Sequence, residues 1–190
     1  MRNEMITAMD RVSIIKAIDT SRTGIIKYLD IMGSFYKVDV SKDMNFQRKF
    51  NGFYRIRQRP IEWYEIYYSY MESQKGNKPQ FAEVLRYLFA ELKRYEPSFS
   101  SKLVATLNPD APIWDQYVLN NIGVKPPAYS SGNKVNKAID AYNQIQKWYE
   151  KFLLTEEANL IIQTFNETIR NHGKITDLKK VDFVLWQLRS

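Results

Sequence analysis

The chain has 190 residues, is 44% hydrophobic and 14% aromatic, and carries a formal net charge of +7 at pH 7. A chain of this size and aromatic content buries a hydrophobic core, so one domain is expected and intrinsic disorder is not. The sequence contains no cysteine, which excludes disulfides, thiolate metal sites, iron–sulfur clusters and cysteine nucleophiles. The positive charge favours polyanions such as nucleic acid as partners, and solubility charge is an equally good explanation of it.

The N-terminal segment does not resemble a signal peptide, because Asp10 and Arg11 interrupt it before an apolar region forms. No apolar run approaches the roughly 20 residues that a membrane-spanning helix requires. A soluble, cytoplasmic protein without a membrane partner is therefore expected, and the lack of cysteine suits a reducing compartment.

The first elements are expected to be helices. Apolar residues at helical spacing predict helices over about 4–18 and 25–33, separated by a break at Thr20–Gly24. Gly33 is a plausible stop for the second of these helices. Ser41 is expected to cap a third helix.

An arginine-rich segment follows at Phe53–Pro60. Arg55, Arg57 and Arg59 alternate along it, so they would project from one side of an extended chain. Aromatic residues beside arginines suit nucleic-acid contact, because arginine binds phosphate and aromatic rings stack on bases. The alternative, which the residues alone favour, is a connector whose arginines are solvated or paired with acidic residues.

Two more helices are expected before the central part of the chain. Pro60 is expected to open the first, which carries an aromatic stripe of core residues and continues to about Met71. The second is amphipathic, begins at Pro79 and ends near Tyr95, just before Pro97.

The stretch from Phe99 to Gly123 carries the most specific pattern. It predicts a short apolar helix, a tight turn at Asn108–Asp110, and a second short helix opening at Pro112. Lys102 is expected in the first turn of one helix, where the positive helix end and apolar neighbours would favour the neutral, nucleophilic amine. Asp115 is expected in the first turn of the next, where helix amides would hold it ionised. The alternative is a surface lysine and a structural aspartate.

The C-terminal third is predicted to be a surface loop followed by three helices. The loop covers 124–132, and the first helix spans about 133–153. Thr155 is expected to cap the second, which stops near Gly173, and Thr176 to cap the last. With about nine or ten helices and no paired strands, the predicted fold class is all-α and multi-helical.

Metal and cofactor chemistry has little support. His172 is the only histidine and lies at a predicted helix end, so neither a zinc site nor a serine–histidine–aspartate triad is expected. The chain has no phosphate-binding glycine loop, and no cofactor is expected.

Ser101–Leu107 followed by Pro112–Leu119 resembles the core of the helix-hairpin-helix DNA glycosylases, and most resembles the branch around 8-oxoguanine DNA glycosylase and its distant bacterial relatives. Lys180–Trp186 also resembles a C-terminal helix common in those relatives. The resemblance implies an all-α fold and DNA as a partner. It also implies that Lys102 attacks the sugar C1′ to give a Schiff base and that Asp115 supports the sugar cation.

The chain departs from the family pattern in the hairpin itself, where Arg94–Phe99 stands in place of the glycine-rich signature. Three hypotheses therefore remain open. The first is a DNA glycosylase that uses Lys102 and Asp115, with phosphate contacts from the three arginines. The second is a non-enzymatic nucleic-acid-binding protein on the same scaffold. The third is a protein-interaction or regulatory helical domain. The glycosylase hypothesis further predicts two helical lobes with a cleft between them.

Overall fold

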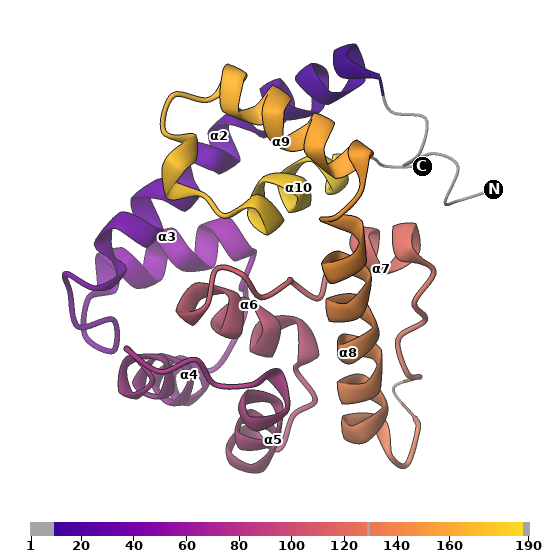
Figure 1. Ribbon diagram of the computed structural model, residues 1–190. Helices are drawn as coiled ribbons and strands as arrows, with labels where there is room; N and C mark the ends of the chain where they lie inside the picture. The colour runs from indigo at the N-terminus through magenta and orange to yellow at the C-terminus, as the bar shows by residue number, and fades with distance from the viewer. Residues whose placement is uncertain (1–9, 129, 188–190) are drawn as a thin grey trace. The chain divides into compact units, whose positions relative to one another are not determined.

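The computed structural model describes residues 10–128 and 130–187, which form nine α-helices and one short 3₁₀-helix without any strand (Figure 1). The predicted all-α, multi-helical class is confirmed. In chain order the elements are α2 (Arg11–Phe35), α3 (Met44–Tyr54), α4 (Ile61–Ser73), α5 (Phe81–Leu92), α6 (Pro97–Leu107), α7 (Gln116–Ile122), α8 (Lys134–Phe152), α9 (Glu156–Thr168), η1 (His172–Lys174) and α10 (Asp177–Leu185).

The chain divides into two compact units. Unit 1 comprises Met1–Arg22 and Pro109–Ser190, and unit 2 comprises Thr23–Asn108. Helix α2 runs from unit 1 into unit 2. The cleft expected between two lobes stays a prediction.

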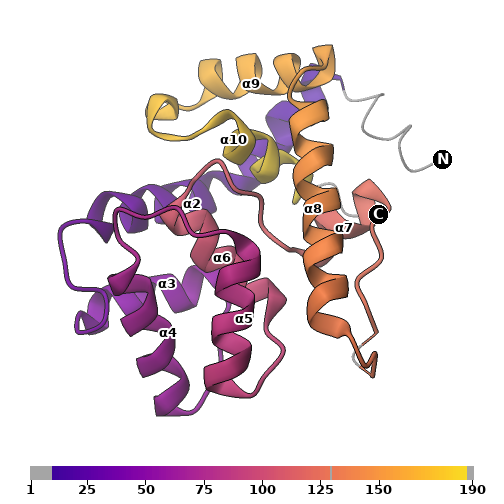
Figure 2. The ribbon, with the colours of Figure 1, turned by 60° about the horizontal axis from the view of Figure 1, so that its bottom comes forward.

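Unit 2 is built on an aromatic core. Helix α5 packs against α6 and against α4, as Figure 2 also shows. The rings of Tyr54, Tyr67 and Tyr68 surround the buried ring of Phe50 with centroids 4.6, 6.2 and 5.8 Å away. Such aromatic pairs stabilise a core beyond the area that they bury. Trp63 and Tyr67 of the predicted aromatic stripe of α4 therefore lie in the core, together with Tyr68, whereas Tyr70 is half-buried.

Unit 1 is organised around α10, in which every residue from Leu178 to Leu185 is buried. This helix packs against α9 and α7. Helix α8 contributes the buried Tyr142, whose hydroxyl donates to the carbonyl oxygen of Pro112 at 2.8 Å. That bond fixes the segment that leads into α7.

The predicted break at Thr20–Gly24 is wrong, because α2 continues through it. Ser21 is buried there and donates to the carbonyl oxygen of Phe183 at 3.1 Å. The buried face also continues past the glycine at Ile25. Burial of that face outweighs the roughly 1 kcal/mol that a glycine costs inside a helix. Positions 4–9 of the predicted 4–18 helix lie outside the described residues.

Two of the three predicted helix caps are confirmed. Thr155 and Thr176 cap α9 and α10 as predicted, accepting from the amides of Ala158 and Lys179. The cap of α3 is Asp43 and not Ser41: its carboxylate accepts from the amide of Phe46 at 2.8 Å.

Two predicted helix bounds are also wrong. Residues 112–114 are buried and non-helical, so α7 begins at Gln116 and not at Pro112. Helix α9 ends at Thr168, and the chain near Gly173 forms η1. None of the helices within 10–128 and 130–187 combines the length and the apolarity needed to cross a membrane.

Candidate functional site

Lys102 is half-buried in the second turn of α6, and not in the first turn as predicted, because the helix begins at Pro97. Its ammonium donates to the main-chain carbonyl of Tyr54 at 3.2 Å. The same nitrogen lies 4.9 Å from the centre of the Phe99 ring and 6.0 Å from that of Tyr54. These are cation–π distances, so two aromatic residues and a carbonyl hold the amine.

The three predicted arginines lie in the linker between α3 and α4, which is not the extended segment that was expected. Arg55 ends α3 with φ 56°, and Gln58 has φ 55°. Both residues adopt left-handed backbone, so the alternation in sequence does not place the arginines on one side. Arg55 and Arg57 are exposed, whereas Arg59 is half-buried.

Arg59 is paired with a buried acid from another linker. Its Nη2 lies 3.3 and 3.4 Å from the carboxylate oxygens of Glu96, to which Arg94 Nε comes within 3.2 Å. The Arg59 guanidinium also lies 5.0 Å from the centre of the Phe99 ring. One phenyl ring is thus close to both Arg59 and Lys102. We call Glu96, Arg59 and Arg94 the Glu96 cluster.

Lys93 and Arg94, which lie in the linker between α5 and α6, were not predicted as site residues. Lys93 has φ 53°, and within the described residues only it, Arg55 and Gln58 combine a side chain with a positive φ. Left-handed backbone at such residues is strained and often marks a functional segment. The Lys93–Arg94 pair is visible in the sequence, but its link to Arg59 through Glu96 spans 37 positions.

We call the residues Arg55, Arg57, Arg59, Lys93 and Arg94 the basic linker surface. All five belong to unit 2, where 14 lysines and arginines stand against 9 aspartates and glutamates between positions 23 and 108. Most of the net charge of +7 therefore resides in unit 2.

Asp115 lies in unit 1 as the N-cap of α7, one residue before the first turn in which it was predicted. Its carboxylate accepts from the amide of Tyr117 at 2.8 Å. A capping role of this kind is typical of aspartate and needs no catalytic explanation. Lys102 belongs to unit 2, so the predicted pairing of Lys102 with Asp115 stays a prediction.

A second charged group in unit 1 is buried. Lys179 Nζ lies 2.5 Å from Asp182 Oδ2, and the Tyr149 hydroxyl donates to Asp182 Oδ1 at 3.3 Å. Burial, followed by the negative charges of Asp182 and Asp115, raises the pKa of Tyr149 well above its ordinary value. We call Lys179, Asp182 and Tyr149 the buried charge cluster.

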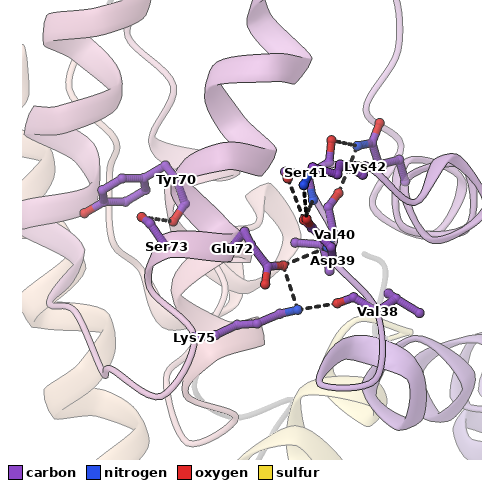
Figure 3. Close-up of polar contacts among 10 residues, drawn as sticks. Val38, Asp39, Val40, Ser41, Lys42, Tyr70, Glu72, Ser73 and Lys75 are labelled. Carbon is purple, nitrogen blue, oxygen red and sulfur yellow. Dashed lines mark hydrogen bonds and ion pairs between the residues drawn. The ribbon is translucent and has the colours of Figure 1, made fainter.

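The loop between α2 and α3 is fixed by the end of α4 (Figure 3). A carboxylate oxygen of Glu72 accepts from the amide of Val40 at 2.7 Å and pairs with Lys75 Nζ at 2.7 Å. Lys75 Nζ also donates to the carbonyl oxygen of Val38 at 2.5 Å. These bonds satisfy the Val40 amide and the Val38 carbonyl, two backbone groups of the loop.

His172, the only histidine in the sequence, is half-buried in η1. Across the described parts of the chain, no three or more histidine, aspartate or glutamate side chains are grouped so that they could hold a metal ion.

The fold defines the class of this chain as a multi-helical, all-α protein. Comparisons with protein-family models, with curated proteins and with solved structures find no match.

Proposed function

We propose that this protein binds DNA through the basic linker surface and acts on abasic or base-damaged nucleotides with Lys102 as the amine nucleophile. The observation that carries the proposal is the convergence in unit 2 of two strained linkers, which bring basic residues together beside the aromatic site of Lys102. Cationic side chains that neutralise phosphates supply most of the affinity of proteins for nucleic acid.

The Tyr54 carbonyl and two aromatic rings position the Lys102 nitrogen at a half-buried site, and the ammonium that they stabilise must lose a proton before it can react. In its neutral form the amine would add to the C1′ aldehyde of an open abasic sugar, and water would leave to give an imine. Exposed Arg55 and Arg57 would contact the flanking phosphates.

The test is borohydride trapping on duplex DNA that carries an abasic site. Borohydride reduces the imine to a stable secondary amine, which joins protein and DNA covalently. Wild type and K93R should form the adduct, whereas K102R should not, since a guanidinium keeps the charge but is a poor nucleophile. Lys93 is an exposed lysine of the same unit and controls for adventitious amines.

The outcomes separate the hypotheses. Loss of trapping in K102R alone would establish a Schiff-base lysine. Equal trapping by wild type and K102R would exclude Lys102 as the nucleophile. Absence of trapping with salt-dependent binding retained would leave a DNA-binding protein without lyase chemistry.

A second candidate function, a protein-interaction domain, rests on exposed apolar side chains. Tyr36 and Met44 are 62% and 73% exposed at the two ends of the loop that Glu72 and Lys75 fix. A rigid loop with exposed apolar ends suits a protein partner, because little entropy is lost when it is buried. Absence of both trapping and DNA binding would favour this function.

A further inference from the structure

Glu96 is a buried carboxylate shared by two arginines from different linkers. Its side chain is only 10% exposed, and that of Arg94 is 52% exposed. The three contacts in the Glu96 cluster measure 3.2 to 3.4 Å. Strong bonds between guanidinium and carboxylate groups are shorter, at about 2.7–2.9 Å. One carboxylate therefore holds both arginines loosely.

The same place has buried donors that Glu96 does not satisfy. Within the described chain, Arg59 Nε and the indole Nε1 of Trp63 are buried without an acceptor. Trp63 is only 2% exposed, and the Arg59 guanidinium lies 5.8 Å from the centre of its ring. An unmet buried donor costs about 1–3 kcal/mol, so an additional acceptor near this cluster would be stabilising.

The charges are also unbalanced. Two guanidinium groups face one carboxylate in the Glu96 cluster, and the Lys102 ammonium lies on the Phe99 ring that Arg59 also approaches. A phosphodiester would bring negative charge and additional oxygen acceptors to arginines, which bind phosphate through their forked donors.

We propose that Glu96 is the resident anion of a phosphate-binding site formed by Arg59 and Arg94, and that a nucleic-acid phosphate displaces it. The inference deepens the proposed function and rests on it for the source of the phosphate. Glu96 then lowers the affinity of the basic linker surface, because binding must first break its pairs with both arginines. Removing its charge should tighten binding.

The experiment compares E96Q with E65Q by fluorescence anisotropy on a DNA duplex at several salt concentrations. Glu65 is an exposed residue of α4, so both variants change the net charge equally. E96Q should bind about fivefold tighter at 0.1 M salt, with a slope of log K against log salt steeper by about 1. E65Q should change the affinity less than twofold. Equal effects of the two variants would overturn the proposal.

Arg94 provides a second test, because its exposed position makes R94A a mild substitution. R94A should reduce affinity in both backgrounds, by less in wild type, where the lost phosphate contact is partly offset by the lost pair with Glu96, and by more in E96Q, where it should remove most of the gain. Equal losses in both backgrounds would contradict competition between Glu96 and phosphate. If E96Q does not fold, E96D keeps the charge but withdraws it from the arginines, and a smaller gain in affinity is expected. No gain in a folded E96D would overturn the proposal.

Inorganic phosphate separates this inference from the proposed function. At ionic strength matched with chloride, phosphate should raise the thermal midpoint of E96Q more than that of wild type. If phosphate stabilises E96Q but neither wild type nor E96Q binds DNA, the proposed function is refuted and the anion site is retained. If E96Q binds DNA with the affinity of wild type and phosphate does not stabilise it, the proposed function is retained and the anion site is refuted.

Discussion

The buried charge cluster of unit 1 and the Glu96 cluster of unit 2 both join a carboxylate to basic side chains. In unit 1, Lys179 and Asp182 are buried and 2.5 Å apart, with one positive and one negative charge. In unit 2, Glu96 faces two arginines at 3.2 to 3.4 Å, and Arg94 is largely exposed. The first cluster is balanced, and the second carries excess positive charge.

That difference separates a structural pair from a binding surface. A buried ion pair is strongly destabilised when one partner is removed, since the other charge is left in the interior. In the Glu96 cluster only Arg94 is exposed, so its substitution costs the fold little, and the excess positive charge of the cluster remains available to an anion. Substitutions in unit 1 should therefore change stability, and those in the basic linker surface should change binding.

The largest effect is expected at alkaline pH. Burial raises the pKa of Tyr67, Tyr68, Tyr142 and Tyr149 above the ordinary value of 10.0. The unfolded chain loses these protons near pH 10 while the folded chain keeps them, so stability falls as pH rises above about 10. Each tyrosine should lower the free energy of unfolding by up to about 1.4 kcal/mol per pH unit. Absorbance at 295 nm should show these tyrosines ionising only as the helical circular dichroism is lost.

The Y149F variant tests the contribution of the buried charge cluster. Above about pH 10 its free energy of unfolding should fall less steeply with pH than that of wild type, because phenylalanine has no proton to release. The difference should equal the contribution of one tyrosine. Ionisation of all the tyrosines before any loss of helical signal would show that the hydroxyls of the two cores are accessible to solvent.

Removal of Asp182 should cause the next largest effect. D182N removes the buried carboxylate that pairs with Lys179, which should lower the free energy of unfolding by about 3–5 kcal/mol in urea denaturation. D177N is the matched control, since the Asp177 side chain is 58% exposed and pairs with Lys180 at 2.7 Å. It should cost less than about 1 kcal/mol. Similar losses for both variants would remove the distinction between buried and exposed pairs.

The fold was largely predictable where a local signal decides the structure. Thr155 and Thr176 cap helices because their hydroxyls reach amides three residues away, a relation that the sequence displays directly. The break expected at Thr20–Gly24 failed because Ser21 is held by the distant carbonyl of Phe183, so a tertiary contact overrides local propensity.

The candidate site was less predictable for the same reason. Lys102, Asp115 and the arginines could be named from the sequence, but the start of α6 at Pro97 moves Lys102 out of the first turn. The partner of Arg59 could not be found, because Glu96 lies 37 positions away. A one-residue shift at a helix end changes which amides a side chain meets, and such ends are the least certain feature of a sequence pattern.

An intermediate effect is expected from the loop contact of α4 (Figure 3). E72A leaves the Val40 amide and the Lys75 ammonium without their shared acceptor, which should cost about 1–3 kcal/mol of unfolding free energy. S73A removes an exposed hydroxyl that donates to the carbonyl of Tyr70 at 2.8 Å, and should cost less than about 0.5 kcal/mol. If thermal denaturation gives equal losses, the loop is held by its own turns and not by Glu72.

The smallest effect on stability is expected from the exposed arginines. They also test whether substitutions in the basic linker surface change DNA binding and leave stability unchanged. R55A/R57A should change the free energy of unfolding by less than about 0.5 kcal/mol for each substitution, because both residues are exposed. The φ of 56° at Arg55 is strained for alanine as well, so the substitution adds little further strain. The same variant should weaken DNA binding and reduce the salt slope by about 2, one for each lost phosphate contact.

The matched control is K134A/K137A, which removes two positive charges from α8 of unit 1. Long-range attraction to DNA falls equally in both double variants, so a difference between them reports contact and not net charge. Anisotropy at 0.05 to 0.3 M salt should show the reduced slope of log K against log salt only for R55A/R57A. Equal slopes would mean that Arg55 and Arg57 make no phosphate contacts and that their positive charge serves solubility.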